Sequence, residues 1–202
     1  MTLRAVLVAP VVAVAGLTVA CSESAGPVAP TATTLVSTSE SARTRSAPAP
    51  TQAAQNFEVD FLKDMIDHHA MAVQTAGICV ENAVHPELIS LCQDIAAAQS
   101  SEIQTMQTWL QSWYGVTHEP EMKASGERMV EKLASLEGAE FEIAFMEMMI
   151  KHHAKAVDDA RMCLDKAWHP ELRELCENII ATQSAEITQL RSWLCAWYGE
   201  CK

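Results

Sequence analysis

The chain is short of positive charge. Its 202 residues include 14 lysines and arginines against 26 aspartates and glutamates, which gives a formal net charge of −12. A protein that binds nucleic acid needs a basic patch to neutralise phosphates, and this sequence offers none. The charge balance therefore argues against nucleic acid as a partner. An acidic surface also attracts cations weakly.

The motifs of several common catalytic sites are also missing. The sequence has no nucleophile elbow, no phosphate-binding glycine loop and no Ser/His/Asp arrangement that we can identify. It contains no CxxC spacing, and no stretch alternates apolar and polar residues convincingly as a half-buried strand would. Nothing in the sequence therefore indicates an organic substrate or a β-sheet.

Residues 1–21 have the layout of an export signal. Arg4 precedes an apolar run that ends in small residues and Cys21. The run is too short and too weakly flanked to be a comfortable membrane-spanning helix. Its end, LTVAC, resembles a bacterial lipobox, which predicts a lipid on Cys21 and anchoring to the outer face of the cell membrane. A plain cleaved signal with a free Cys21 is the alternative.

Residues 22–56 consist mainly of Ser, Thr, Ala and Pro and have no apolar periodicity. Such a segment has little to bury, so we expect a disordered tether. A tether of this kind, with a lipid at one end, would hold a domain away from a membrane surface.

The remaining residues, 57–202, have the length of one domain and contain an internal repeat. Residues 57–115 align with 141–199 without a gap, and about half of the positions are identical. Each copy predicts two helices, because apolar residues recur three and four positions apart on both sides of an HP turn. Two antiparallel hairpins bury their apolar faces best against each other, so we expect an all-α four-helix bundle. The connector, 116–140, contains a stretch compatible with a short helix.

Apart from Cys21, the cysteines form three pairs that are close in the sequence: Cys79–Cys92, Cys163–Cys176 and Cys195–Cys201. In an exported chain the even count predicts three disulfides, with a thiolate zinc site as the alternative. A bridge across each hairpin also fixes the register of its helices. The first bridge places His69 level with Glu102, and the second places His153 level with Glu186.

The stretches MIDHHAMAV, from Met65, and MIKHHAKAV, from Met149, put two adjacent histidines in the same apolar setting twice. A Gln and a Glu recur on the facing helix of each copy, at positions of the apolar stripe. A core-facing carboxylate is costly unless a histidine or a metal ion pairs with it. We favour a metal centre, and a buried His–Glu network is the alternative. The predicted ligands are His68, His69, His152, His153, Met65, Met149, Glu102 and Glu186, supported by Gln99 and Gln183.

The ligand types favour copper. Imidazole with thioether suits copper, especially Cu(I), whereas imidazole with carboxylate suits zinc, Cu(II) or iron. A di-iron carboxylate centre usually needs Glu-x-x-His, which neither histidine pair has. Glu58 and Glu142 recur, but they lie about three helical turns from the histidines, too far to share an ion with them. His85 and His169, in HPEL, are predicted to be turn and helix-start residues.

The stretches FLKDMIDHHAMAV and FMEMMIKHHAKAV, each followed by a helix with Q-x-x-E-I and a tryptophan-containing end, resemble the bacterial "domain of unknown function 305" family. The resemblance covers nearly all of the chain after the tether and implies an exported, ferritin-like bundle. Some members are described as copper-binding proteins. By resemblance, copper ligands would be Met65, His68, His69 and Met71 in the first copy, and Met149, His152 and His153 in the second. Lys155 stands where the first copy has Met71, which argues against equal metal affinity of the two copies.

Taken together, these patterns predict an exported, lipid-anchored bundle that binds a transition metal, copper first, with zinc or iron as alternatives. Sequestration or handover of the metal outside the cytoplasm is the leading function. A metal-dependent redox enzyme at the same site is the second hypothesis. A structural or interaction module without a metal is the third. The membrane is contacted through the lipid only, and no protein partner is indicated.

Overall fold

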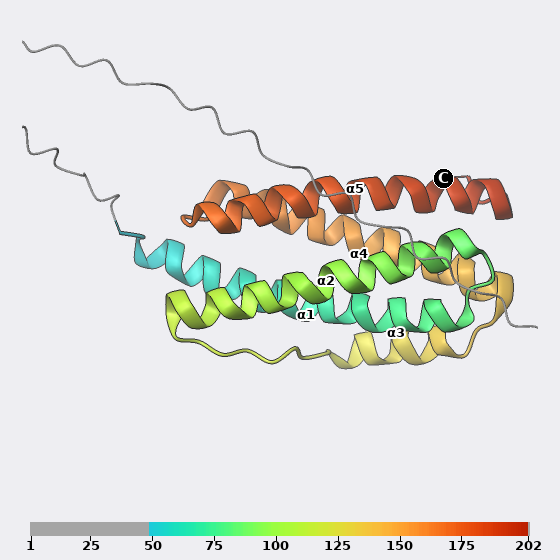
Figure 1. Cartoon of the computed structure of the whole chain (residues 1–202), viewed down its shortest axis with the longest axis horizontal. Helices are drawn as coiled ribbons and strands as arrows, with labels where there is room; N and C mark the ends of the chain where they lie inside the picture. The colour runs from blue at the N-terminus through green and yellow to red at the C-terminus, as the bar shows by residue number, and fades with distance from the viewer. Residues whose placement is uncertain (1–48, 202) are drawn as a thin grey trace, which may run out of the picture. The chain divides into compact units, whose positions relative to one another are not determined.

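The structure, a computed structural model, describes residues 49–201. The predicted signal, the predicted lipidation site and most of the predicted tether lie outside the described residues. All regular secondary structure in residues 49–201 is α-helical (Figure 1). None of these helices is long and apolar enough to cross a membrane.

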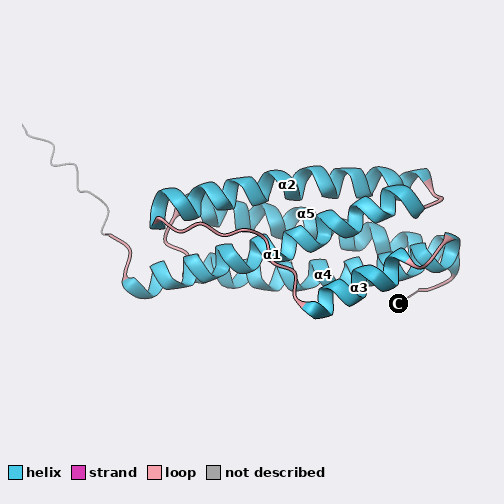
Figure 2. Cartoon of the chain, turned by 90° about the horizontal axis from the view of Figure 1, so that it is seen from below, coloured by secondary structure: helices cyan, strands magenta, loops and turns pink. Residues whose placement is uncertain are grey.

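Four long helices and one short helix make up the bundle: α1 (Gln52–Asn82), α2 (Pro86–Tyr114), α3 (Ala124–Ala134), α4 (Gly138–Lys166) and α5 (Pro170–Tyr198). The pairs α1/α2 and α4/α5 form the two hairpins that the repeat predicts. The hairpins meet through α1 and α4, and α3 packs on both of these helices (Figures 1 and 2). The predicted all-α class and hairpin arrangement are confirmed.

Local sequence signals set most helix boundaries. Pro86 and Pro170 begin α2 and α5, where a residue without an N–H leaves no hydrogen bond unmade. Gly115 ends α2 in the left-handed region, at φ 66°, which glycine adopts without strain. The α1 helix begins at Gln52, earlier than the predicted start near Phe57. Its start is fixed by Thr51, whose Oγ1 accepts a hydrogen bond from the Ala54 N–H at 3.2 Å.

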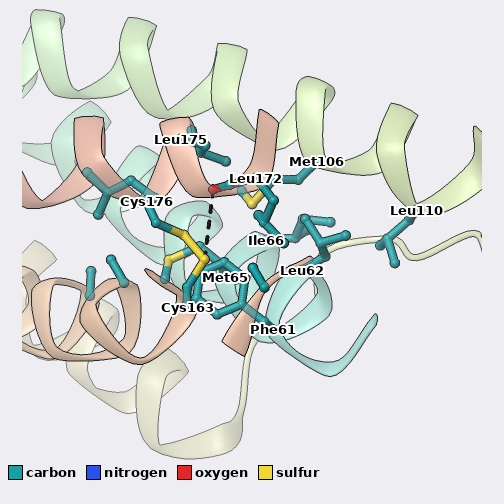
Figure 3. Packing of buried hydrophobic residues seen from close by; sticks show 14 residues of the cluster. Phe61, Leu62, Met65, Ile66, Met106, Leu110, Cys163, Leu172, Leu175 and Cys176 are labelled. Atoms are coloured by element: carbon teal, nitrogen blue, oxygen red, sulfur yellow. Dashed lines mark hydrogen bonds between the residues drawn. A yellow bond between two sulfur atoms is a disulfide. The ribbon is translucent and has the colours of Figure 1, made fainter. Parts of the chain in front are cut away.

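Two hydrophobic clusters fill the bundle. The first joins the first half of α1 and the second half of α2 to the α4/α5 turn region, and it includes Phe61, Leu62 and Leu172 (Figure 3). The second cluster joins the first half of α4 and the second half of α5 to the α1/α2 turn region, and it includes Ile95 and Phe145. The two clusters are therefore related by the pseudo-twofold symmetry expected of two packed copies. The predicted histidine and glutamate positions lie between the two clusters along the helices.

Disulfides tie each hairpin together near its turn. The structure contains the bridges Cys79–Cys92 and Cys163–Cys176, with Cα–Cα distances of 6.1 and 6.4 Å, and a third bridge, Cys195–Cys201, at the C-terminal end. The four core cysteines are therefore engaged with one another. This pairing leaves no thiolates for the zinc site that was the alternative interpretation of the sequence.

Candidate metal centre

Four histidines form a row across the middle of the bundle. His68 and His69 come from α1, and His152 and His153 come from α4. The rings of His68 and His152 stack with their centroids 3.6 Å apart and their planes 29° from parallel. The outer rings are 6.2 and 6.1 Å from their inner neighbours. The packing of α1 on α4 thus brings both histidine pairs to one place.

A carboxylate of the facing helix meets each outer histidine. His69 is fully buried, and its Nε2 lies 2.7 Å from Glu102 Oε2 in a hydrogen bond. His153 is also fully buried, and its Nε2 lies 2.8 Å from Glu186 Oε2, although the alignment is not that of a hydrogen bond. These are the two pairs that the cysteine register predicts. The hydrogen bond with Glu102 orients the His69 ring, in the way that carboxylates commonly orient metal-binding histidines.

Several ring nitrogens in this row are buried and make no hydrogen bond within residues 49–201. They are Nδ1 of His68 and His69, and both nitrogens of His152 and His153. A buried polar atom without a partner costs about 1–3 kcal/mol, so each of these atoms calls for a ligand or a water molecule. The amide oxygens of Gln99 and Gln183 beside them are unpaired in the same way.

The inner histidines are held neutral. Burial, followed by repulsion from His69, lowers the pKa of His68 to about 3. Burial, followed by repulsion from His68, lowers the pKa of His152 to about 2. Both rings therefore keep a free lone pair near pH 7. The neutral imidazole is the form that binds a metal ion.

Two cavities on either side of α3 reach His68 and His152. The first, about 540 Å³, also contains four methionines in its lining: Met65, Met71, Met122 and Met162. The second, about 660 Å³, is lined by Met71, Met129 and Met148. Thioether and imidazole together are soft donors, which suit Cu(I) better than zinc or magnesium. The surroundings of the inner histidines therefore combine free imidazole nitrogens with methionine sulfurs.

The described residues contain no group of three or more His, Cys, Asp or Glu side chains close enough to hold a metal ion together. Met65 and Met71, which the sequence suggests as copper ligands, line the first cavity. Met149 lies elsewhere: it is fully buried in the second hydrophobic cluster and lines neither cavity.

Sequence reasoning missed the methionines outside the repeated motif. Met122 and Met129 belong to the connector and α3, which have no counterpart in the second copy. Their proximity to the histidines depends on the path of the connector over α1. Only the methionine content of this segment could have drawn attention to it.

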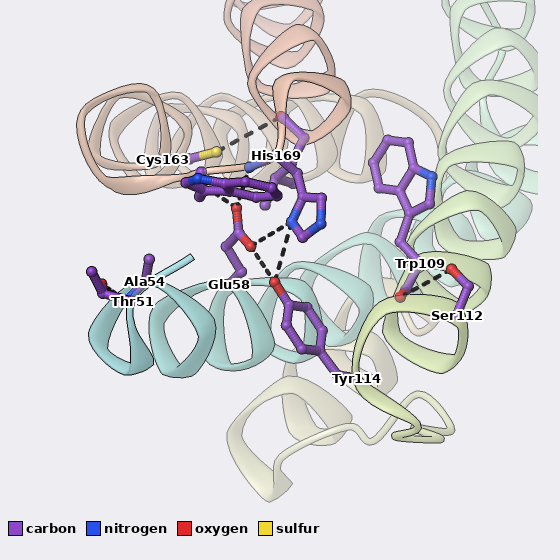
Figure 4. Close-up of polar contacts among 10 residues, drawn as sticks. Thr51, Ala54, Glu58, Trp109, Ser112, Tyr114, Cys163 and His169 are labelled. Atoms are coloured by element: carbon purple, nitrogen blue, oxygen red, sulfur yellow. Dashed lines mark hydrogen bonds and ion pairs between the residues drawn. The ribbon is translucent and has the colours of Figure 1, made fainter. Parts of the chain in front are cut away.

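Sequence reasoning also missed a second polar site, centred on the buried Glu58 of α1 (Figure 4). Its carboxylate accepts hydrogen bonds from the backbone N–H groups of Trp168 and His169, at 2.7 and 2.8 Å, and from the Tyr114 hydroxyl. His169 Nδ1 lies 2.7 Å from the same carboxylate, and its ring stacks on Trp113. Glu58 therefore joins the first helix of one hairpin to the turn of the other.

Glu142 of α4 repeats this arrangement towards the first hairpin. It accepts from the backbone N–H groups of Val84 and His85, at 2.6 and 2.8 Å, and from the Tyr198 hydroxyl. Burial by itself would raise the pKa of Glu142, but the hydrogen bonds from Tyr198, His85 and Val84 outweigh it and hold that pKa below its ordinary value. Glu58 and Glu142 are thus structural carboxylates that join the two hairpins.

The profile of the protein family described as "Domain of unknown function (DUF305)" matches residues 58–194. The chain belongs to this family. Among solved structures, it is similar to CopM, a protein whose Cu(I)-bound form is 33% identical with a TM-score of 0.64, over 70% of this chain and 98% of that chain. CopM in its Ag-bound form, obtained by co-crystallisation, is 34% identical with a TM-score of 0.63 over the same shares.

A DUF305 fragment from Deinococcus radiodurans is also similar: it is 29% identical, with a TM-score of 0.62, over 73% of this chain and 98% of that chain. No curated protein matches the sequence. The DUF305 resemblance of the histidine motifs is therefore confirmed, and the helical fold of this chain is that of solved DUF305 proteins.

Proposed function

We propose that this DUF305 protein binds copper, preferentially as Cu(I), in the layer that contains His68 and His152. The observation that carries the proposal is the stacked pair of neutral imidazoles, with unpaired nitrogens, at the floor of two methionine-lined cavities. Cu(I) accepts soft donors and low coordination numbers, so two or three such groups suffice. The similarity to CopM, solved in Cu(I)-bound, Cu(II)-bound and Ag-bound forms, supports copper binding.

Within this site, we assign binding to the inner histidines together with Met65 and Met71. His69 and His153 present an unpaired Nδ1 while Nε2 faces a glutamate, so they are available as further ligands. Glu102 and Glu186 hold these two rings and supply negative charge beside a bound cation. Gln99 and Gln183 complete the buried polar layer. Met149 contributes to the core.

The proposed role is sequestration or handover of copper outside the cytoplasm. Three disulfides suit an oxidising compartment, where they persist. The lipid anchor at Cys21 is part of the same proposal. Labelling with a radioactive fatty acid tests it: the wild-type protein should carry label, and a Cys21→Ala variant should not.

A second candidate function is favoured by the His69–Glu102 and His153–Glu186 pairs. His69 and Glu102 satisfy each other through a hydrogen bond, and His153 lies 2.8 Å from Glu186, which is what a purely structural network would use. In that case the protein would be an interaction module. It would take up no metal, and His69→Ala would lower stability by the same amount with and without copper.

Competition for Cu(I) against a chromogenic chelator, without oxygen, separates the two candidates. We expect tight uptake by the wild-type protein and its loss in a His68→Leu/His152→Leu variant. A His85→Gln/His169→Gln variant is the matched control, because it removes two imidazoles that lie away from the central row. Circular dichroism verifies that each variant is folded. Equal uptake by wild type and the His68/His152 variant would overturn the proposed site.

A further inference from the structure

The connector lies close to the inner histidines, because residues of the connector and α3 line both cavities that contain His68 and His152. It runs from the end of α2 along α1 to α3 (Figure 2). Its path is fixed by Asp67, whose Oδ1 lies 2.7 Å from His118 Nε2 and accepts the Glu121 N–H at 2.8 Å. The Gln107 amide donates to the His118 carbonyl oxygen at 3.0 Å. Asp67 directly precedes His68, so the connector is attached immediately beside the proposed copper site.

This attachment is specific to the first copy. Asp67 aligns with Lys151 in the second copy, and a lysine has no acceptor for the imidazole or the backbone N–H. The equivalent of Met71 is Lys155, which offers no thioether and whose ammonium group is paired with Asp159 at 2.7 Å. The two copies therefore surround the histidine row with different chemistry.

Met122 follows the fixed segment directly and is half-buried. A Cβ atom placed on Gly126 would lie 3.4 Å from Met122 Sδ and 3.7 Å from Met71 Sδ. The two sulfurs are therefore at most about 7.1 Å apart (3.4 Å plus 3.7 Å). Both line the same cavity as His68. The glycine keeps this space open, because a side chain there would press on Met122, whose Cγ would be only 3.0 Å away.

The charges around α3 also distinguish this cavity from its neighbour. Five carboxylates and two lysines line the cavity that contains Met122. One carboxylate and four basic side chains line the cavity on the other side of α3. A cation is therefore attracted to the Met122 side and repelled from the other side.

We propose that the connector supplies Met122 as an additional thioether ligand for Cu(I), beside Met71 and His68, and that Asp67 and His118 are positioning residues for it. This inference rests on the proposed copper-binding function and makes the site asymmetric. Methionine sulfur is an uncharged, soft donor, so a further thioether beside imidazole suits Cu(I). The Asp67–His118 contact holds the connector over α1 and thereby lowers the conformational entropy that Met122 loses when it binds the ion.

The test compares Met122→Leu with Met129→Leu by Cu(I) competition on the full protein with its disulfides formed. Both variants replace one methionine near α3 by a residue of similar size, but Met129 lines the basic cavity. We expect Met122→Leu to weaken Cu(I) binding at least about tenfold, because even residues that only orient ligands cost 10- to 100-fold. We expect Met129→Leu to bind as wild type does, and X-ray absorption to report one sulfur fewer in Met122→Leu alone.

The outcomes separate this inference from the proposed function. If the wild-type protein takes up no Cu(I), the proposed function fails. If it binds Cu(I) and Met122→Leu has the same affinity and sulfur count, the role of Met122 is wrong while copper binding stands. Equal losses in Met122→Leu and Met129→Leu would also overturn the assignment.

A double-mutant cycle tests the positioning role. His118→Ala should weaken Cu(I) binding in the wild-type background and have no further effect in the Met122→Leu background, because it acts through Met122. Losses that simply add would show that His118 acts by another route and would overturn its assignment.

Discussion

Replacement of Glu58 by alanine should strongly destabilise the bundle. The side chain is completely buried, and its carboxylate receives hydrogen bonds from Tyr114 and from the turn that contains Trp168 and His169. Burial by itself would raise the pKa of Glu58, but the hydrogen bonds from Tyr114, His169 and Trp168 outweigh it and hold that pKa below its ordinary value. The group is therefore ionised at neutral pH. Its removal leaves two backbone N–H groups without an acceptor.

The size of the effect follows from the number of donors left behind. A hydrogen bond to a charged group contributes about 1.5–3 kcal/mol, but the contributions within one cluster do not add, and water can replace part of them. Each buried donor left without an acceptor costs about 1–3 kcal/mol. With two backbone N–H groups and the Tyr114 hydroxyl left behind, we expect Glu58→Ala to lower the free energy of unfolding by about 3–5 kcal/mol. For a domain of this size, each kcal/mol corresponds to roughly 2–4 °C in Tm.

Urea and thermal unfolding, followed by circular dichroism, measure this loss. Glu58→Gln should lose less than Glu58→Ala, because the amide oxygen can still accept from the turn. Glu142→Ala should resemble Glu58→Ala, since its surroundings repeat those of Glu58. The matched control is Glu177→Ala on the exposed face of α5. A loss in Glu58→Ala no larger than that in the control would refute the claim that this carboxylate joins the hairpins.

Three further predictions concern other parts of the molecule. Below about pH 6.5 the unfolded chain protonates His68 and His152, whereas the folded protein keeps them neutral because their pKa values are lowered. The free energy of unfolding without metal should therefore fall from pH 6.5 to 5, by up to about 1.4 kcal/mol per pH unit for each histidine. Denaturant midpoints measure this slope, and the same slope in a His68→Gln/His152→Gln variant would contradict the explanation. Replacing both Cys79 and Cys92 by serine should lower the free energy of unfolding by about 3 kcal/mol, because the bridge closes a short loop; an unchanged Tm would show that packing alone holds the hairpin. Lys155→Met should raise Cu(I) affinity or stoichiometry in titrations, since it replaces a positive charge in both cavities by a thioether. In a Lys155→Leu control, Cu(I) affinity should rise only through the loss of charge. Equal increases in affinity in the two variants would exclude a thioether contribution.

Much of the fold follows from local and repeated signals. The HP turns and terminal glycines set the ends of the second helix in each hairpin. The cysteine pairs then fix the register of the two helices in each hairpin. This register correctly places His69 opposite Glu102 and His153 opposite Glu186. Every one of these inferences concerns residues within one hairpin, where a short turn and a covalent bridge restrict the geometry.

The features that sequence reasoning missed concern contacts between the hairpins and the path of the connector. Glu58 meets His169 because α1 packs antiparallel to α4, which places the start of one helix beside the turn of the other hairpin. No bridge links the hairpins, so the sequence does not specify that register. Met122 was missed for the same reason, because its place near Met71 depends on how the connector attaches to Asp67.

X-ray absorption at the copper edge of the Cu(I)-loaded protein shows directly which atoms bind the metal. We expect mixed sulfur and imidazole ligation in the wild-type protein, with the sulfur arising from methionine because the described cysteines of the bundle are paired. We expect this signal to be lost in the His68→Leu/His152→Leu variant. Copper bound by nitrogen and oxygen alone, or the same spectrum in that variant, would contradict a methionine–histidine copper centre between the two hairpins.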